Sequence, residues 1–195
     1  MEIFTNEEWG WLPSAIVYLL NTVLILFLGK VLFQWFHKKI DIQKELVKED
    51  NFAFALASVG YYIGLLIAIS AAIIGDSYGI GWDVLNMLSF GILAALLLNI
   101  ASLINDKIIL DTFSVRKEIF RDHNSGTGVI EAANFIACGL IINGAMTGEM
   151  SNLFPNMPYG WLTSGIVSVI IFWGIGQALL IILTKVYSKV LPYDV

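Results

Sequence analysis

The sequence predicts an all-α integral membrane protein with five transmembrane helices. Of its 195 residues, 57% are hydrophobic and 14% are charged, whereas about a quarter of the residues of a soluble domain are charged. The apolar residues gather into five runs, each about as long as the roughly 20 helical residues that cross a bilayer. Basic residues fall on alternate connections between the runs. We therefore expect a single membrane domain over residues 1–195, without a soluble module.

The predicted spans follow directly from the apolar runs. The first run begins after Glu7 and Glu8 and lacks the basic segment and the cleavage site of a signal peptide, so we expect it to stay in the membrane. The connections are too short to hold another folded domain. In chain order, the spans are Pro13 to Phe36, Phe52 to Ile74, Val84 to Ile104, Val129 to Met146 and Trp161 to Thr184.

The distribution of charge predicts the orientation of the helices. The amino-terminal tail and the connections at 75–83 and 148–160 hold no Lys or Arg. Because short basic loops stay on the cytoplasmic side, we expect the amino terminus outside and the carboxyl terminus in the cytoplasm. The eleven basic residues are Lys30, Lys38, Lys39, Lys44, Lys48, Lys107, Arg116, Lys117, Arg121, Lys185 and Lys189.

The sequence also repeats itself at a shift of 73 residues. The unit is a helix, a charged connector and a second helix, so repeat one covers about 9–75 and repeat two about 82–148. The last helix, about 161–187, resembles the first half of a third copy. Because each unit has two spans, both copies enter the membrane in the same direction, which predicts a tandem parallel repeat of helical hairpins. Aligned pairs include Glu45 with Glu118, Asn51 with Asn124, Ile63 with Ile136 and Gly75 with Gly148.

The connectors within the repeats combine apolar and charged residues. Ile40 with Val47, and Ile109, Phe113 and Phe120, form apolar stripes against Lys, Arg, Asp and Glu. This pattern is typical of helices at a membrane surface. A solvated face shaped by charge bias is one interpretation of these Lys-Glu connectors, and a docking surface for a cytoplasmic partner is the other.

The second span carries a ridge of small residues at every fourth position, Gly60, Gly64, Ala68 and Ala72. Such a ridge lets another helix backbone approach closely. The partner helix can belong to the same chain or to another subunit of a homo-oligomer, and the sequence leaves both open.

Glu131 is the one acidic residue within the five apolar runs. It follows Asn124 by seven residues, and Asn134 and Cys138 continue the same helical face. An ionisable group at this depth usually faces a bundle interior or marks an ion path. Glu131, Asn134 and Asn124 are therefore a candidate ion or proton site. Alternatively, Glu131 lies among the lipid headgroups near the positive end of its helix and pairs with Arg121, His123 or Lys107.

The sequence contains no recognisable catalytic or metal-binding pattern. His37 and His123 lie in separate connectors, and the single cysteine, Cys138, lies inside a span. We therefore expect no enzyme, no metal and no cofactor. Nucleic-acid binding is not expected either, because the basic residues are interleaved with acidic ones.

The stretch from Arg121 to Ala133, followed by Ala137 to Ala145, resembles the YjfL-like family of bacterial inner-membrane proteins, known as domain of unknown function 350. Asp50 to Gly75 resembles the other repeat of that family. The resemblance covers about residues 11–189 and implies a bacterial cytoplasmic membrane location with paired helices. It leaves the activity open. Asn143 stands where this resemblance predicts an apolar or small residue.

Three functions are compared on this basis. The leading hypothesis is a non-enzymatic membrane component, homo-oligomeric and acting in envelope maintenance or stress response. The alternative is a small transporter or channel in which Glu131 and Asn134 line a path that faces the cytoplasm. A membrane-embedded enzyme would need several ionisable residues at one depth, and the sequence shows one.

Overall fold

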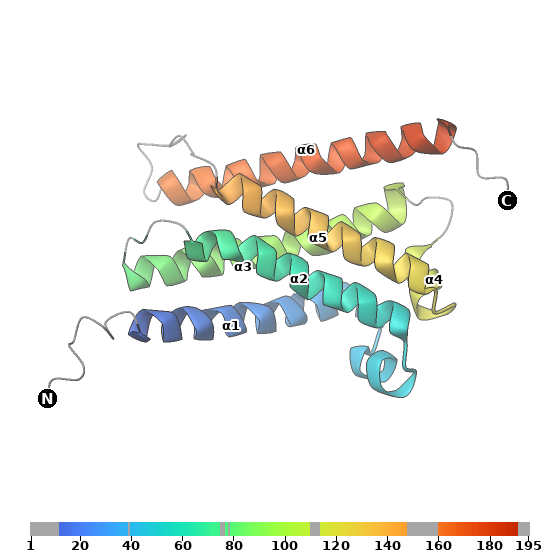
Figure 1. Ribbon diagram of the computed structural model, residues 1–195, viewed down its shortest axis with the longest axis horizontal. Helices are drawn as coiled ribbons and strands as arrows, with labels where there is room; N and C mark the ends of the chain where they lie inside the picture. Colours follow the sequence, from blue (N-terminus) through green and yellow to red (C-terminus); the bar gives the residue numbers. More distant parts are fainter. Residues whose placement is uncertain are drawn as a thin grey trace, which may run out of the picture.

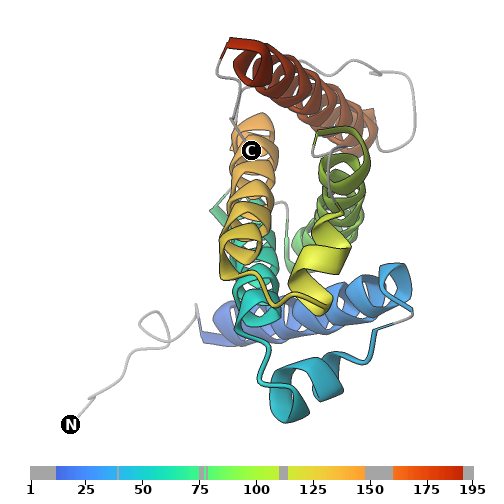
Figure 2. The same ribbon diagram turned by 90° about the vertical axis from the view of Figure 1, so that its right-hand side faces the viewer.

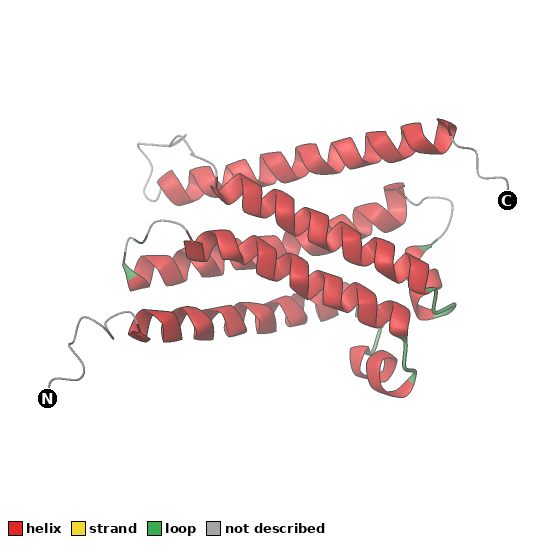
Figure 3. Ribbon diagram, in the orientation of Figure 1, coloured by secondary structure: helices red, strands yellow, loops and turns green. Residues whose placement is uncertain are grey.

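The computed structural model of the protein describes residues 12–38, 40–74, 77, 79–109, 114–147 and 160–190. These residues form helices, turns and short loops, without a strand (Figure 3). The elements η1 and η2 are single turns of π-helix, and η2 directly continues α3. In chain order, the elements are α1 (Leu12–Phe36), η1 (Lys44–Lys48), α2 (Phe52–Ile74), α3 (Ile80–Ile104), η2 (Asn105–Ile109), α4 (Val115–Phe120), α5 (Ser125–Thr147) and α6 (Gly160–Val190).

Five of the described helices are long and apolar enough to cross a membrane, which confirms the predicted spans. Helices α3 and α5 begin four residues before the apolar runs do, at Ile80 and Ser125. Helix α6 runs past its apolar segment to Val190. Hydropathy misses these ends because the first and last turns of a helix hold polar and small residues.

Helices α1 and α6 lie on opposite sides of the bundle, with α2, α3 and α5 between them (Figure 1). Viewed from its end, the bundle has α2 and α5 in one layer and α3 beside them (Figure 2). Helices α1, α3 and α6 run in one direction, and α2 and α5 run in the other. We call the end where α1 and α3 finish and α2 and α5 begin the basic end. Among the described residues it carries Lys38, Lys44, Lys48, Lys107, Arg116, Lys117 and Arg121.

Helices α2 and α5 run parallel with their backbones in direct contact. A Cβ atom on Gly60 would fall on Ala132, and one on Gly64 would fall on the carbonyl group of Phe135. Gly139 of α5 faces the carbonyl group of Gly64 in the same way. In the structure, the glycines of the small-residue ridge therefore pack within the chain, because only a residue without Cβ allows this approach.

The contact between α2 and α5 continues away from the basic end. Ala68 is fully buried, and Ala72 is partly buried against the core. Nδ2 of Asn143 donates hydrogen bonds to the carbonyl oxygen of Ile67 (2.9 Å) and to Oγ of Ser70 (3.0 Å). Asn143 therefore joins α5 to α2, at a position where the family resemblance predicts an apolar or small residue.

The starts of α2 and α5 have the same local structure. The residue before each cap, Asp50 or His123, has a φ of 48°. Oδ1 of Asn51 and of Asn124 then accepts a hydrogen bond from the backbone three residues later, at 3.0 and 3.3 Å. Each Nδ2 donates to the glutamate six residues earlier, at 2.9 Å. These bonds satisfy first-turn N–H groups, so the two asparagines act as helix caps.

The two connectors differ in how they meet the bundle. In α4, Val115 and Ile119 are buried against α2 and α5. In η1, Val47 is 73% exposed, while Ile40 is buried. The predicted stripe of Ile40 with Val47 is therefore wrong as a single face, because Ile40 precedes the helical segment 42–48 that holds Val47. Phe120 is half-buried. Phe113, the side chain of Ile109, and the aligned glycines Gly75 and Gly148 lie outside what the structure describes.

Candidate ion site

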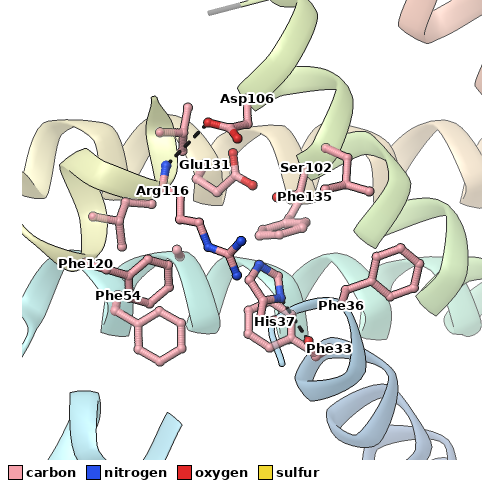
Figure 4. A pocket seen from close by; sticks show the side chains of 14 residues that line it. Phe33, Phe36, His37, Phe54, Ser102, Asp106, Arg116, Phe120, Glu131 and Phe135 are labelled. Carbon is pink, nitrogen blue, oxygen red and sulfur yellow. Dashed lines mark hydrogen bonds between the residues drawn. The ribbon is translucent and has the colours of Figure 1, made fainter. Parts of the chain in front are cut away.

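A cavity of about 60 Å³ lies at the basic end of the bundle (Figure 4). One water molecule needs about 10–15 Å³ of such volume, so the cavity has room for a few waters or for a small ion that keeps part of its hydration. Its apolar wall consists of Phe33, Phe36, Phe54, Ala57, Leu103, Val115, Ile119, Phe120 and Phe135. Its polar wall consists of His37, Ser102, Asp106, Arg116 and Glu131.

Glu131 is the most deeply buried charged group of this wall, with 3% of its surface exposed. Its Oε2 accepts a hydrogen bond from Nδ2 of Asn105 at 2.6 Å, and Asn105 is itself buried. Its Oε1 makes no hydrogen bond of good geometry among the described residues, and the nearest donor to the carboxylate besides Asn105 is the hydroxyl group of Ser102. The carboxylate of Asp106 also lies close to it. An ionised carboxylate buried among so few donors is costly, so a bound proton or cation would stabilise it.

The basic residues proposed as partners of Glu131 lie elsewhere. Within the described part of the chain, Lys107, Arg121 and His123 form no ion pair with its carboxylate. Nε of Arg121 lies 4.0 Å from Oδ1 of Asp122 instead. The described residues therefore do not show the proposed pairing, because the Glu131 side chain points inward to Asn105 of η2 while those residues lie on the exposed surface.

The three predicted site residues occupy three different environments. Glu131 lines the cavity, whereas Asn124 is exposed and caps α5, with Oδ1 bound to the N–H groups of Gly126 and Thr127. Asn134 is 7% exposed and lies one turn further into the bundle than Glu131. Neither its Oδ1 nor its Nδ2 has a partner among the described residues. Asn134 and Glu131 thus share a helical face, and Asn124 has a structural role.

His37 is a cavity residue that sequence reasoning missed. Its Nδ1 lies 2.9 Å from the carbonyl oxygen of Phe33, and its ring stacks on the ring of Phe33 at 4.3 Å. Burial lowers the pKa of His37, the bond to Phe33 raises it, and the charge of Arg116 lowers it. The Nδ1 contact fits a donated hydrogen bond from a neutral ring, which leaves Nε2 as an acceptor.

Arg116 was also missed, since in the sequence it is one of several basic residues in a connector. Its guanidinium group points toward the ring of His37 (Figure 4). Its backbone N–H donates to Oδ1 of Asp106 at 3.4 Å. His37 and Arg116 are far apart in the chain, so no local pattern could have paired them. Among the described residues, no group of three or more His, Cys, Asp or Glu side chains could hold a metal ion.

Comparisons with known proteins agree with the resemblance found in the sequence. The model of a family described as Domain of Unknown Function (DUF350) matches residues 8–146. A UPF0719 transmembrane protein of Aquifex aeolicus is 22% identical over 177 residues, which cover 91% of this chain and 60% of that relative. The chain therefore spans about three-fifths of the length of this curated relative. No solved structure matches the chain.

Proposed function

Because the chain belongs to the DUF350 family, which has no assigned activity, we propose a function from its cavity: Glu131 binds a proton or a small monovalent cation inside the membrane. The protein would then act as a small transporter or channel, with the cavity as its entrance. The observation that carries this proposal is the Glu131 carboxylate, which lines the cavity, is 3% exposed and has no basic side chain paired with it among the described residues.

The charges of the cavity wall favour a single positive charge as ligand. Asp106 and Glu131, when ionised, contribute two negative charges, and Arg116 contributes one positive charge, which leaves a net charge of −1. His37 adds no charge near neutral pH, because burial lowers its pKa. One proton or one alkali ion neutralises this wall. Carboxylate and hydroxyl oxygens are also the ligands that hard cations prefer.

The orientation of the site is part of the proposal. The basic end carries most of the Lys and Arg residues, so we place it in the cytoplasm of a bacterial cell, at the inner membrane. The amino terminus then lies outside and the carboxyl terminus inside. The cavity would accordingly exchange its ligand with the cytoplasm.

The architecture is proposed to be a tandem parallel repeat, about 9–75 and about 82–148, followed by the extra helix of about 161–187. Two features support it. Asn51 and Asn124 cap parallel helices with the same bonds, and Ser70 contacts Asn143 at the repeat shift of 73 residues. The Glu131 position is occupied by Ser58 in the first repeat, so only one copy holds a carboxylate.

A homo-oligomeric component of envelope maintenance or stress response remains a second proposal. The glycines that suggested self-association pack against α5, so an oligomer would have to use other faces, such as those of α1 and α6. A docked cytoplasmic partner would meet η1, where Val47 is 73% exposed. Cross-linking in native membranes tests the oligomer, and a strictly monomeric result removes it.

Carbodiimide labelling of the purified protein in lipid vesicles tests the ion site. The reagent attacks protonated carboxyl groups in apolar surroundings, and mass spectrometry locates the product. We expect labelling at Glu131. Slower labelling in Na⁺ or K⁺ at constant pH identifies an alkali ion as ligand, whereas dependence on pH alone identifies a proton.

Matched carboxyl groups and variants provide the controls. Asp83 is also buried but lies at the opposite end of the bundle, with Tyr18 and Ser77 as hydrogen-bond donors at 2.6 Å, so ions should not protect it. Glu131→Gln should abolish both the label and any proton or cation flux into the vesicles. Labelling of Glu131 that neither pH nor ions change, or flux that persists in Glu131→Gln, would contradict the proposal.

A further inference from the structure

Lys30 is a charged residue on the lipid-facing side of a membrane-spanning helix. Helix α1 forms one side of the bundle (Figure 1), and Lys30 is exposed on it, six residues before its last residue, Phe36. The buried residues of α1, which face the bundle, are Asn21, Ile25, Gly29 and Phe33. Lys30 therefore lies about 9 Å along the helix axis from the basic end. A positive charge at this depth is costly unless it reaches the headgroups or an anion.

Lys30 belongs to a face that combines two lysines with apolar and aromatic side chains. Its neighbours at helical spacing are exposed, as is Lys38, which follows α1 on the same side. We call this set the exposed face of α1. It consists of Phe27, Lys30, Val31, Trp35 and Lys38.

The ammonium group of Lys38 bends back toward the membrane. Its Nζ lies 5.0 Å from the centre of the Trp35 ring, three residues earlier in the chain, where a cation–π contact stabilises it. Tryptophan rings prefer the headgroup region, so Trp35 marks that level on α1. A lysine within a span extends its flexible side chain toward the nearer interface, so Lys30 approaches the same level from inside the membrane. Two positive charges therefore meet near the headgroups.

The chain does not balance these two charges with a carboxylate. Within the described ranges, neither lysine of the exposed face forms an ion pair. Asp41 is the acidic residue nearest to Lys38 in the sequence, but its Oδ1 accepts a hydrogen bond from the backbone N–H of Lys44 at 3.1 Å. The exposed face therefore carries a charge of +2 that an external anion can neutralise.

The depth of the face identifies this anion. Glu131 is the one acidic residue within the five apolar runs, and it is buried in its own bundle, so a second copy of the chain offers no exposed carboxylate at this depth. A free anion does not enter the hydrocarbon, because burial of a charge is costly. Lipid phosphate groups lie at the edge of the hydrocarbon, and anionic lipids attract lysines there. The charge of +2 favours an anionic lipid over a zwitterionic one.

We propose that the exposed face of α1 binds an anionic phospholipid of the leaflet at the basic end. Its phosphate group lies between the ammonium groups of Lys30 and Lys38, and an acyl chain runs along Val31 and Phe27. This site is separate from the proposed ion site, because no residue of the exposed face lines the cavity.

Native mass spectrometry of the whole protein in detergent measures the affinity for single lipids. Dioleoyl phosphatidylglycerol is the anionic probe, and dioleoyl phosphatidylcholine is the zwitterionic control with the same chains. We expect the first phosphatidylglycerol to bind at least about tenfold more tightly than phosphatidylcholine. A lysine near the membrane surface contributes about fivefold to such binding, so Lys30→Gln and Lys38→Gln should each weaken it about fivefold and the double variant about 25-fold.

Three variants provide the controls. Lys30→Arg keeps the charge and should keep the wild-type affinity. Lys107→Gln removes an exposed lysine from η2, which contacts α6 on the other side of the bundle, and should also keep it. Lys38 lies beyond the end of α1, so Lys38→Gln alone tests the site if Lys30→Gln does not fold.

The possible results separate a lipid from other ligands. Equal affinities for the two lipids, or equal affinities of the wild type and the double variant, overturn the proposal. A complex with inorganic phosphate that requires both lysines also overturns it, because the ligand is then a free anion. An oligomer that the double variant dissociates, with lipid affinity unchanged, assigns the face to a second copy of the chain instead.

Discussion

Gly64→Ala tests one of the closest helix contacts among the described residues. A Cβ atom at this position would fall on the carbonyl group of Phe135, so α2 and α5 must move apart to admit it. This contact is between backbones, and a rotamer change cannot relieve it. Phe135 also lines the cavity, so a shift of α5 at this contact moves part of the wall that Glu131 shares.

The size of the effect follows from two opposing terms. Overpacking a tight contact costs up to about 3 kcal/mol. Alanine favours a helix over glycine by about 1 kcal/mol, which offsets part of that cost. We therefore expect Gly64→Ala to lower the free energy of unfolding by about 2 kcal/mol.

Gly144 provides the matched control in α5, because a Cβ there would meet no atom within 4 Å. Gly144→Ala carries only the gain in helix propensity and should raise the free energy of unfolding by up to about 1 kcal/mol. Unfolding of both variants by a denaturing detergent in mixed micelles measures the difference. Equal stability of Gly64→Ala and the wild type would refute the reasoning, as would an equal loss in Gly144→Ala.

Two further predictions concern the basic end. Asn51→Ala should lower the free energy of unfolding by about 2–3 kcal/mol in the same assay, because it removes a cap and leaves the buried carbonyl group of Ile119 without its 2.9 Å donor. Asn124→Ala removes only a cap and should lower it by about 1 kcal/mol. Equal losses in the two variants would contradict this reasoning. His37 has its pKa lowered by burial from its ordinary value of 6.5, so the folded protein binds fewer protons than the unfolded chain. The free energy of unfolding should therefore be highest above pH 6.5 and should fall as the pH drops below that value. His37→Gln should weaken this pH dependence when unfolding is measured across the same range.

The spans could be predicted from the sequence because lipid imposes a strong and local constraint. A stretch such as Phe52–Ile74 must be apolar along its whole length, and its bounds match the structure. The start of α5 was placed too late, because Ser125 and Thr127 lower the hydropathy of a turn that the Asn124 cap makes helical. Capping is readable in sequence, but only when the polar residues are considered one by one.

The candidate site could be predicted only at Glu131, where an acidic residue interrupts an apolar run. The Phe33, His37 and Arg116 side chains reach the same cavity from separate elements, so their role depends on how the helices pack. Asn124 was assigned to the site because it stands two turns before Glu131. Helical spacing gives the shared face but not the direction of a capping side chain, which turns back to its own helix.

The light packing of α6 has a consequence for how the protein is made. Only 17% of its apolar span is buried, against 50% for α2 and for α3, and it meets the bundle chiefly through α5. The four preceding spans emerge from the ribosome first and hold the tightest contacts, so they can associate in the membrane before α6 is synthesised. Docking of α6 then encloses the sulfur of Cys138, so the contact of Gln177 with Cys138 forms after the contacts among the four preceding spans.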